Sequence, residues 1–129
     1  MGLAGTADLA EVIRRADAGD DVAGLALGVY LHRLRAGIAA MAAALGGLDV
    51  LVFTGGVGEH APAVRASAVA GLPFLGVDLD PDANATADPD SAVPPGVCDV
   101  GRAGAAARVL VITAREEVEI ARGVRALLT

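Results

Sequence analysis

The most distinctive chemistry in the sequence lies in a run of glycines that follows a short apolar segment. Residues 54–59 read Thr-Gly-Gly-Val-Gly-Glu, and they come directly after the mostly apolar residues 48–53. Glycines allow a ligand to approach the backbone closely, and free N–H groups at the start of a following helix favour anions. No Gly-Lys-Ser/Thr sequence follows, so the run is not a P-loop. It predicts either an anion-binding turn or a tight strand-to-helix connection without a ligand.

A dinucleotide-binding fingerprint is an alternative interpretation of the same residues. Three small residues fit the pattern G-x-G-x-x-G/A, and two aspartates follow about 20 residues later: Gly56, Gly58, Ala61, Asp78 and Asp80. That fingerprint normally opens its domain, whereas a long helical pair comes before it here. Pro62 also falls where the phosphate-facing helix would begin. A Rossmann-like dinucleotide-binding module is therefore the second hypothesis.

Two acidic residues fall at the expected starts of helices. Asp8 can cap the first helix, and Glu116 falls in the first turn of the last helix, where the helix dipole favours acids. Taken alone, both residues have this ordinary structural explanation.

Apolar periodicity predicts the elements that position these residues. Helices and strands are expected to alternate as an α/β layered domain. The first expected helix ends near residue 18. Three more are expected at 20–45, 62–70 and 115–128. The expected strands span 48–53, 74–79, 97–100 and 107–113, and residues 80–95 are expected to form a surface loop. Two helices have apolar stripes expected to face inward: Leu27, Leu31, Leu34, Ile38, Met41 and Leu45, and then Val118, Ala121, Val124 and Leu128.

The composition argues against several classes of function. The net charge is −6 and no basic run occurs, so we expect no nucleic-acid partner. The lone Cys98 rules out an internal disulfide and fits a reducing compartment. The apolar stretch 37–48 is shorter than the roughly 20 residues that span a bilayer, and Asp8 and Glu11 interrupt any signal-like run. We therefore expect a cytoplasmic protein with no membrane partner.

A wider set of segments resembles the acetate kinase family. The motif Phe-Thr-Gly-Gly-x-Gly-Glu is highly specific to it, and the matching segments are 2–5, 43–59, 64–65, 74–80, 109–112 and 116–122. The resemblance covers nearly the whole chain but about the last third of a full family member. It implies a partial ribonuclease-H-like domain of the actin-like ATPase superfamily, with a mixed sheet flanked by helices. Residues 1–129 would be the C-terminal nucleotide-binding domain, with the N-terminal domain absent.

The resemblance also implies a set of ligand-binding residues. The family transfers a phosphoryl group from ATP to acetate, giving ADP and acetyl phosphate, with Mg²⁺. Carried over by position, the wall of the adenine and ribose site would be Gly55, Gly56, Val57 and Gly58. Asp8 would lie in the nucleotide pocket, and Glu116 would be linked to Mg²⁺. His60 stands where the family has Asn, and Ala10 stands where it has Arg, which implies weaker nucleotide binding.

The catalytic part of the family's machinery has no counterpart in this sequence. In the family, residues earlier in the chain handle acetate and the transferring phosphoryl group, so the resemblance implies no catalytic residue here and negligible turnover by the chain alone. Half of a two-domain clamp leaves its cleft face uncovered, so we expect a homodimer or other self-association. A third hypothesis is a non-catalytic fragment that forms an interface through helix 20–45.

Overall fold

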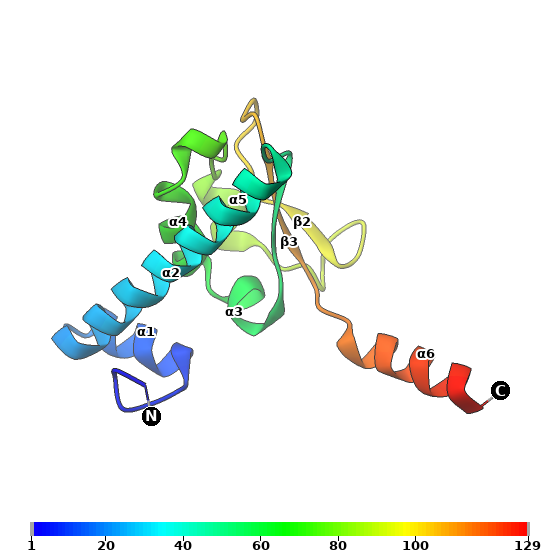
Figure 1. Ribbon diagram of the computed structural model, residues 1–129, viewed down its shortest axis with the longest axis horizontal. Coiled ribbons are helices and arrows are strands. Elements are labelled where there is room, and N and C mark those ends of the chain that lie inside the picture. Colours follow the sequence, from blue (N-terminus) through cyan, green and yellow to red (C-terminus); the bar gives the residue numbers. More distant parts are fainter. Residues whose placement is uncertain (1, 129) are drawn as a thin grey trace.

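A three-stranded mixed sheet lies at the centre of the structure, a computed structural model that describes residues 2–128 (Figure 1). The strands are ordered β1-β3-β2 and span β1 (Val50–Phe53), β2 (Val97–Asp99) and β3 (Arg108–Ile112). β1 runs parallel to β3, with Phe53 opposite Val111, and β2 runs antiparallel to β3. The chain therefore leaves β1 and β3 at the same edge of the sheet. The prediction of a mixed sheet flanked by helices is confirmed.

Helices flank this sheet, and one of them stands apart from it. The helices that the structure describes are α1 (Leu9–Asp17), α2 (Asp21–Leu45), α3 (Gly55–His60), α4 (Pro62–Ala70), α5 (Pro81–Thr86), α6 (Glu116–Leu128) and the 3₁₀ helix η1 (Pro73–Leu75). α1 packs along the N-terminal half of α2, and α4 packs on the C-terminal half of α2. α6 extends away from all other elements in Figure 1.

The core covers one face of the sheet. Leu51, Phe53, Val109 and Val111 point into it and meet residues of α4 and the segment after it. On the other face of β1, Val50 and Val52 are 40% and 44% exposed. The expectation that residues 48–53 are buried on both faces is therefore wrong. Alternate residues of a strand face opposite sides, and residues 2–128 leave the second side of β1 half-covered.

Helix α2 connects this core to a smaller one at the N-terminus. Near its start it packs against α1 around Ala23, and further along Leu34 and Ile38 pack against the sheet core. The last third of the expected stripe is exposed, because Met41 and Leu45 are 62% and 76% accessible. Gly46 ends the helix with φ +76°, a conformation that glycine adopts without strain.

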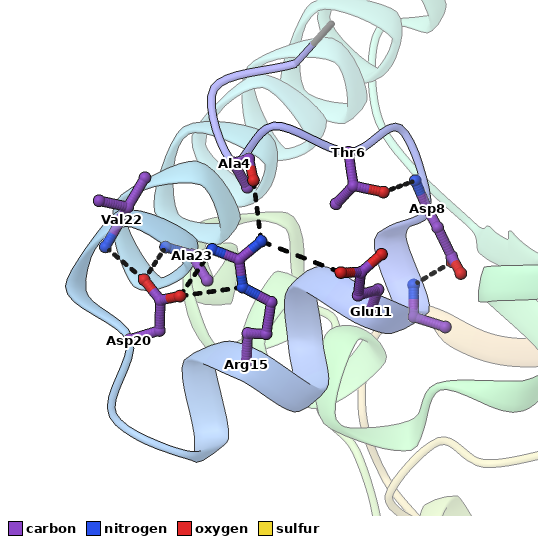
Figure 2. Close-up of polar contacts among 9 residues, drawn as sticks. Ala4, Thr6, Asp8, Glu11, Arg15, Asp20, Val22 and Ala23 are labelled. Carbon is purple, nitrogen blue, oxygen red and sulfur yellow. Dashed lines mark hydrogen bonds and ion pairs between the residues drawn. The ribbon is translucent and has the colours of Figure 1, made fainter.

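A charged cluster holds α1 against the start of α2 (Figure 2). Asp20 accepts the backbone N–H groups of Val22 and Ala23 at 3.0 and 3.1 Å and pairs with Arg15 at 2.6 Å. Arg15 also donates to the carbonyl of Ala4 at 2.8 Å. The hydrogen bond from Arg15, followed by that from Ala23, lowers the pKa of Asp20 below the ordinary aspartate value. One aspartate thus caps α2 and pairs with α1, in addition to the apolar packing between the two helices.

Two predictions about the middle of the chain are wrong. Residues 74–79 do not form a strand: η1 occupies the start, and isolated bridges join Val77 to Ala107 and Leu79 to Gly101. Residues 80–95 are not wholly a loop, because α5 begins there. Asp80 caps α5 and a proline fills its first position, which is a common way to begin a helix.

Candidate functional site

The glycine run folds as a helix rather than as an open turn. α3 starts at Gly55 immediately after β1, and Gly55 has φ +73°. Gly58 packs on the strand, where an added Cβ would lie 3.1 Å from the carbonyl carbon of Phe53. Each glycine in a helix interior costs about 1 kcal/mol relative to alanine. A six-residue helix with three glycines therefore needs anchors from outside itself.

Glu59 anchors the N-terminus of α3. The residue is 7% exposed, and its Oε1 atom accepts the backbone N–H of Gly55 at 2.6 Å. The same oxygen accepts the N–H of Ala114, which lies just beyond β3, at 2.9 Å. The expectation that free N–H groups begin this helix is corrected in part, because a carboxylate of the chain already occupies the first of them.

Arg65 anchors the C-terminus of α3 and is 1% exposed. Its Nη1 donates to the carbonyl oxygens of Gly58 and Glu59, both at 2.8 Å. Its Nε and Nη2 donate to the side-chain and backbone oxygens of Asn84 at 2.7 Å each. Asn84 in turn donates to the carbonyl of Pro62 at 3.0 Å. Burial lowers the pKa of Arg65, since its acceptors here are neutral oxygens.

A cleft opens at each end of α3. The first, the α6 cleft, has a volume of about 780 Å³ and is lined by Thr54, Gly55, Ala114, Arg115, Glu116, Glu119 and Ile120. The second, the α1 cleft, has a volume of about 370 Å³ and is lined by Ala10, Ile13, Arg14, Asp17, His60, Ala61, Pro62 and Ala63. The glycine helix therefore lies between a cleft with two glutamates and an arginine and a cleft of mixed apolar and polar residues.

The residues expected to form the site divide between these clefts. Gly55 and Glu116 line the α6 cleft, although 61 positions separate them in sequence. His60 lines the α1 cleft. The remaining residues of α3 lie between the two, and they are Gly56, Val57 and Gly58. A Cβ on Gly56 would meet nothing within 4 Å, so its backbone faces open space.

Asp8 lies outside both clefts, at the N-terminus of α1. Its Oδ1 accepts the N–H of Ala10 at 2.9 Å, so it caps the helix. Ala10 itself lines the α1 cleft, where it faces the same space as His60. Ala10 and His60, two positions that differ from the pattern implied by the resemblance, therefore line the same cleft. Arg14, one helical turn beyond Ala10, lines this cleft too.

The acidic side chains of the α6 cleft suit a metal bound through phosphate and water. Glu116 and Glu119 line the cleft, and Glu119 is paired with Arg122 at 2.5 Å. Among residues 2–128, no group of three His, Cys, Asp or Glu side chains could hold a metal ion. Side chains of the described residues alone therefore cannot complete the coordination shell of a metal ion. Mg²⁺ usually binds one or two carboxylates and completes its shell with water and substrate phosphates, and Glu116 fits that donor set.

The acids required by the dinucleotide hypothesis have other partners. Asp78 pairs with Arg102 at 2.6 Å, and Asp80 caps α5 through the N–H groups of Asp82 and Ala83. The glycines of the fingerprint lie inside α3 rather than in a loop. The structure therefore gives this hypothesis no support.

Sequence reasoning missed the roles of Glu59, Arg65 and Asn84. Arg65 carried a usable signal, because it occupies an inward-facing position beside Val64 and one turn before Ala68. A charged residue among inward-facing apolar ones indicates a buried polar network. No local pattern links Glu59 to Ala114, because they are 55 residues apart.

The arrangement of helices and strands is that of solved acetate and propionate kinases. The chain is 30% identical to an acetate kinase from Porphyromonas gingivalis, with a TM-score of 0.81 over 98% of this chain and 31% of that one. It is also 30% identical to a propionate kinase from Francisella tularensis, with a TM-score of 0.77 over 92% and 28%. These similarities show that the chain has the α/β fold of one part of those kinases.

The chain belongs to the acetokinase family, whose model matches residues 1–122. It is 50% identical over 115 residues to the acetate kinase of Gloeobacter violaceus, which is 89% of this chain and 27% of that relative. The chain therefore spans less than a third of the length of the relatives it matches. Within residues 2–128, no helix is both long enough and apolar enough to cross a membrane.

Proposed function

We propose that this chain is the C-terminal, nucleotide-binding part of an acetate kinase and that it binds ADP or ATP along α3. The adenosine end lies in the α1 cleft, and the phosphates with Mg²⁺ lie in the α6 cleft. The observation that carries the proposal is the shared lining of the α6 cleft by Gly55 and Glu116. A glycine backbone lets a phosphate approach closely, and a carboxylate at the same cleft can share Mg²⁺ with that phosphate.

The α1 cleft supplies groups that suit an adenosine. Ile13 and Pro62 offer apolar surface to a purine ring, and the imidazole of His60 offers a hydrogen bond. Arg14 supplies a cation in the cleft where the family pattern places one at position 10. We therefore propose that Arg14 takes over part of that role, so the loss at position 10 weakens nucleotide binding without abolishing it. Asp8 contributes by fixing the start of α1.

The proposed reaction belongs to a longer protein. Phosphoryl transfer depends on positioning the substrates and neutralising charge, and Mg²⁺ supplies part of that neutralisation when it is bound. In this chain Glu116 would hold the metal and α3 would orient the nucleotide. The arginines that would surround acetate and the transferring group have no counterpart here. We expect no acetyl phosphate above background from the 129-residue chain in a hydroxamate assay; turnover by the isolated chain would contradict this view.

Calorimetry tests the binding proposal directly. The chain is titrated with ADP-Mg, ATP-Mg and NAD, and saturable binding of the adenine nucleotides without NAD binding is expected. Gly56→Val and Glu116→Ala should each weaken ADP-Mg binding at least tenfold. Gly37→Val is the matched control for the first, since a Cβ there also meets open space, and Glu117→Ala is the control for the second. NAD binding, or equal effects of variants and controls, would contradict the proposal.

We also propose that the chain associates with a second copy of itself through α2. Its N-terminal half exposes Leu25 and Val29, which are 65% and 42% accessible. Gly24 and Gly28 lie beside them and leave a shallow groove that another helix can enter. Sedimentation should detect a concentration-dependent dimer that Leu25→Glu disrupts. A monomer at all concentrations would contradict this second proposal and leave the first intact. The cytoplasmic location expected from the lone cysteine stays a prediction.

A further inference from the structure

We propose that Glu59 is a positioning residue that links the glycine helix α3 to the segment 113–115, which leads into α6 and Glu116. This inference rests on the proposed function, because its consequence is a fixed spacing between the two halves of a nucleotide site. The geometric part stands without any ligand. One buried carboxylate oxygen accepts N–H groups from the exits of two parallel strands, at 2.6 Å from Gly55 and 2.9 Å from Ala114.

The topology explains why a link is needed at this place. β1 and β3 are hydrogen-bonded up to the pair Phe53 and Val111, and beyond that pair the ladder stops. The chain then enters α3 after β1 and the irregular segment 113–115 after β3. Glu59 connects these two segments beyond the point where hydrogen bonds between β1 and β3 end. Because no residue of α6 is buried, the hydrogen bond at Ala114, two residues before Glu116, helps to fix where this helix begins.

The chemistry of the link favours a carboxylate. Two N–H donors converge on a single acceptor, and hydrogen bonds to an ionised oxygen are about twice as strong as neutral ones. Glutamine keeps an acceptor of the same reach but loses the charge, and alanine removes the acceptor. A purely local helix cap would involve Gly55 alone. The bond to Ala114, across 55 residues, distinguishes a link from a cap.

Amide hydrogen exchange tests the link with no nucleotide present. Glu59→Ala should speed exchange of the Gly55 and Ala114 amides at least tenfold, and Glu59→Gln should restore part of the protection. The amide of Gly71, which donates within the α4 terminus, should be unchanged in both variants. Unchanged protection of Ala114 in Glu59→Gln and Glu59→Ala would overturn the proposal. If the alanine variant fails to fold, a shifted Ala114 amide resonance in the isosteric Glu59→Gln supports the link and an unshifted one overturns it.

Nucleotide affinity tests the consequence. Dissociation constants for ADP are compared with Mg²⁺ and with a chelator, and Glu59→Gln should lower the gain from Mg²⁺ at least threefold. The double variant with Glu116→Gln should lose little more than Glu116→Gln alone, since both changes act on one contact. Equal losses with and without metal, or additive losses, would overturn the positioning role. Failure of the unsubstituted chain to bind ADP contradicts the proposed function instead, and hydrogen exchange still decides the link.

Discussion

Helices α3 and α6 leave the same edge of the sheet, yet the structure holds them in opposite ways. α3 has three glycines in six residues and little helical tendency of its own, and two buried charged side chains, Glu59 and Arg65, fix its ends. α6 has good helix formers over thirteen residues, and every one of them is exposed. Helix α3, whose residues have low helix propensity, is therefore stabilised by tertiary contacts. Helix α6 depends mainly on the helix propensity of its own residues.

The largest expected effect comes from removing the anchor at the C-terminus of α3. Arg65→Ala leaves the oxygens of Asn84 and two backbone carbonyls without their donor in a buried site. Each buried oxygen left without its donor costs about 1–3 kcal/mol. Urea unfolding should therefore report a large loss in the free energy of unfolding, or no folded protein at all.

Arg102→Ala is a control for the loss of an arginine at an exposed position. Arg102 also pairs with a side chain, at 2.6 Å from Asp78, but both side chains are more than half exposed. Exposed pairs contribute about 0–1 kcal/mol. Arg102→Ala should therefore change stability little, and the milder Arg65→Lys should fall between the two. Similar losses for Arg102→Ala and Arg65→Ala would remove the distinction between buried and surface anchors.

A smaller effect is expected where α3 touches the strand. Gly58→Ala brings a Cβ to 3.1 Å from the backbone of Phe53, so α3 must shift, at a cost of about 1–3 kcal/mol. Gly56→Ala meets nothing within 4 Å and should leave the fold neutral or stabilised by up to about 1 kcal/mol. Thermal unfolding of both variants measures the difference. Equal melting temperatures would mean that Gly58 does not pack closely against Phe53 of β1.

Several elements could be predicted from the sequence alone. The strands at 97–100 and 107–113, the long helix and the family were predicted, because apolar periodicity and sequence motifs are local signals. The inward face predicted for α6 is wrong, since Val118 and Val124 are 40% and 50% exposed. Periodicity reports that a helix has an apolar side, and it cannot report whether the chain supplies anything to cover that side.

The residues of the candidate site were proposed from the sequence, but the contacts that hold them were not. Glycines 55, 56 and 58 came from the glycine motif and Glu116 from the family resemblance, and Gly55 and Glu116 line one cleft. The restraints on them could not be named. Glu59 and Arg65 act across 55 and 19 residues through hydrogen bonds that no local pattern encodes. Non-local polar contacts of this kind need coordinates.

Substitutions on α6 should have a much smaller effect on stability. Leu127 is 88% exposed, so Leu127→Gln should change the free energy of unfolding by less than about 0.5 kcal/mol. Val109→Ala, at a fully buried position in β3, should cost more than about 1.5 kcal/mol from lost apolar burial. Urea unfolding measures both. A large loss for Leu127→Gln would show that α6 is covered in solution, which is the outcome expected if another chain or segment binds it.

The smallest effect is expected at the junction of α1 and α2, where a charged anchor lies at the surface. The bond from Arg15 lowers the pKa of Asp20, so its contribution is present above the ordinary aspartate range and is lost as pH falls through the lowered folded-state pKa. An NMR titration of the Val22 and Ala23 amides should therefore show a transition on the acidic side of that range. Arg15→Gln should move the transition toward the ordinary value. Because solvent screens this anchor, neither change should loosen α3, whose own charged anchors are buried; a coupled response in α3 would mean that surface and buried anchors act as one network.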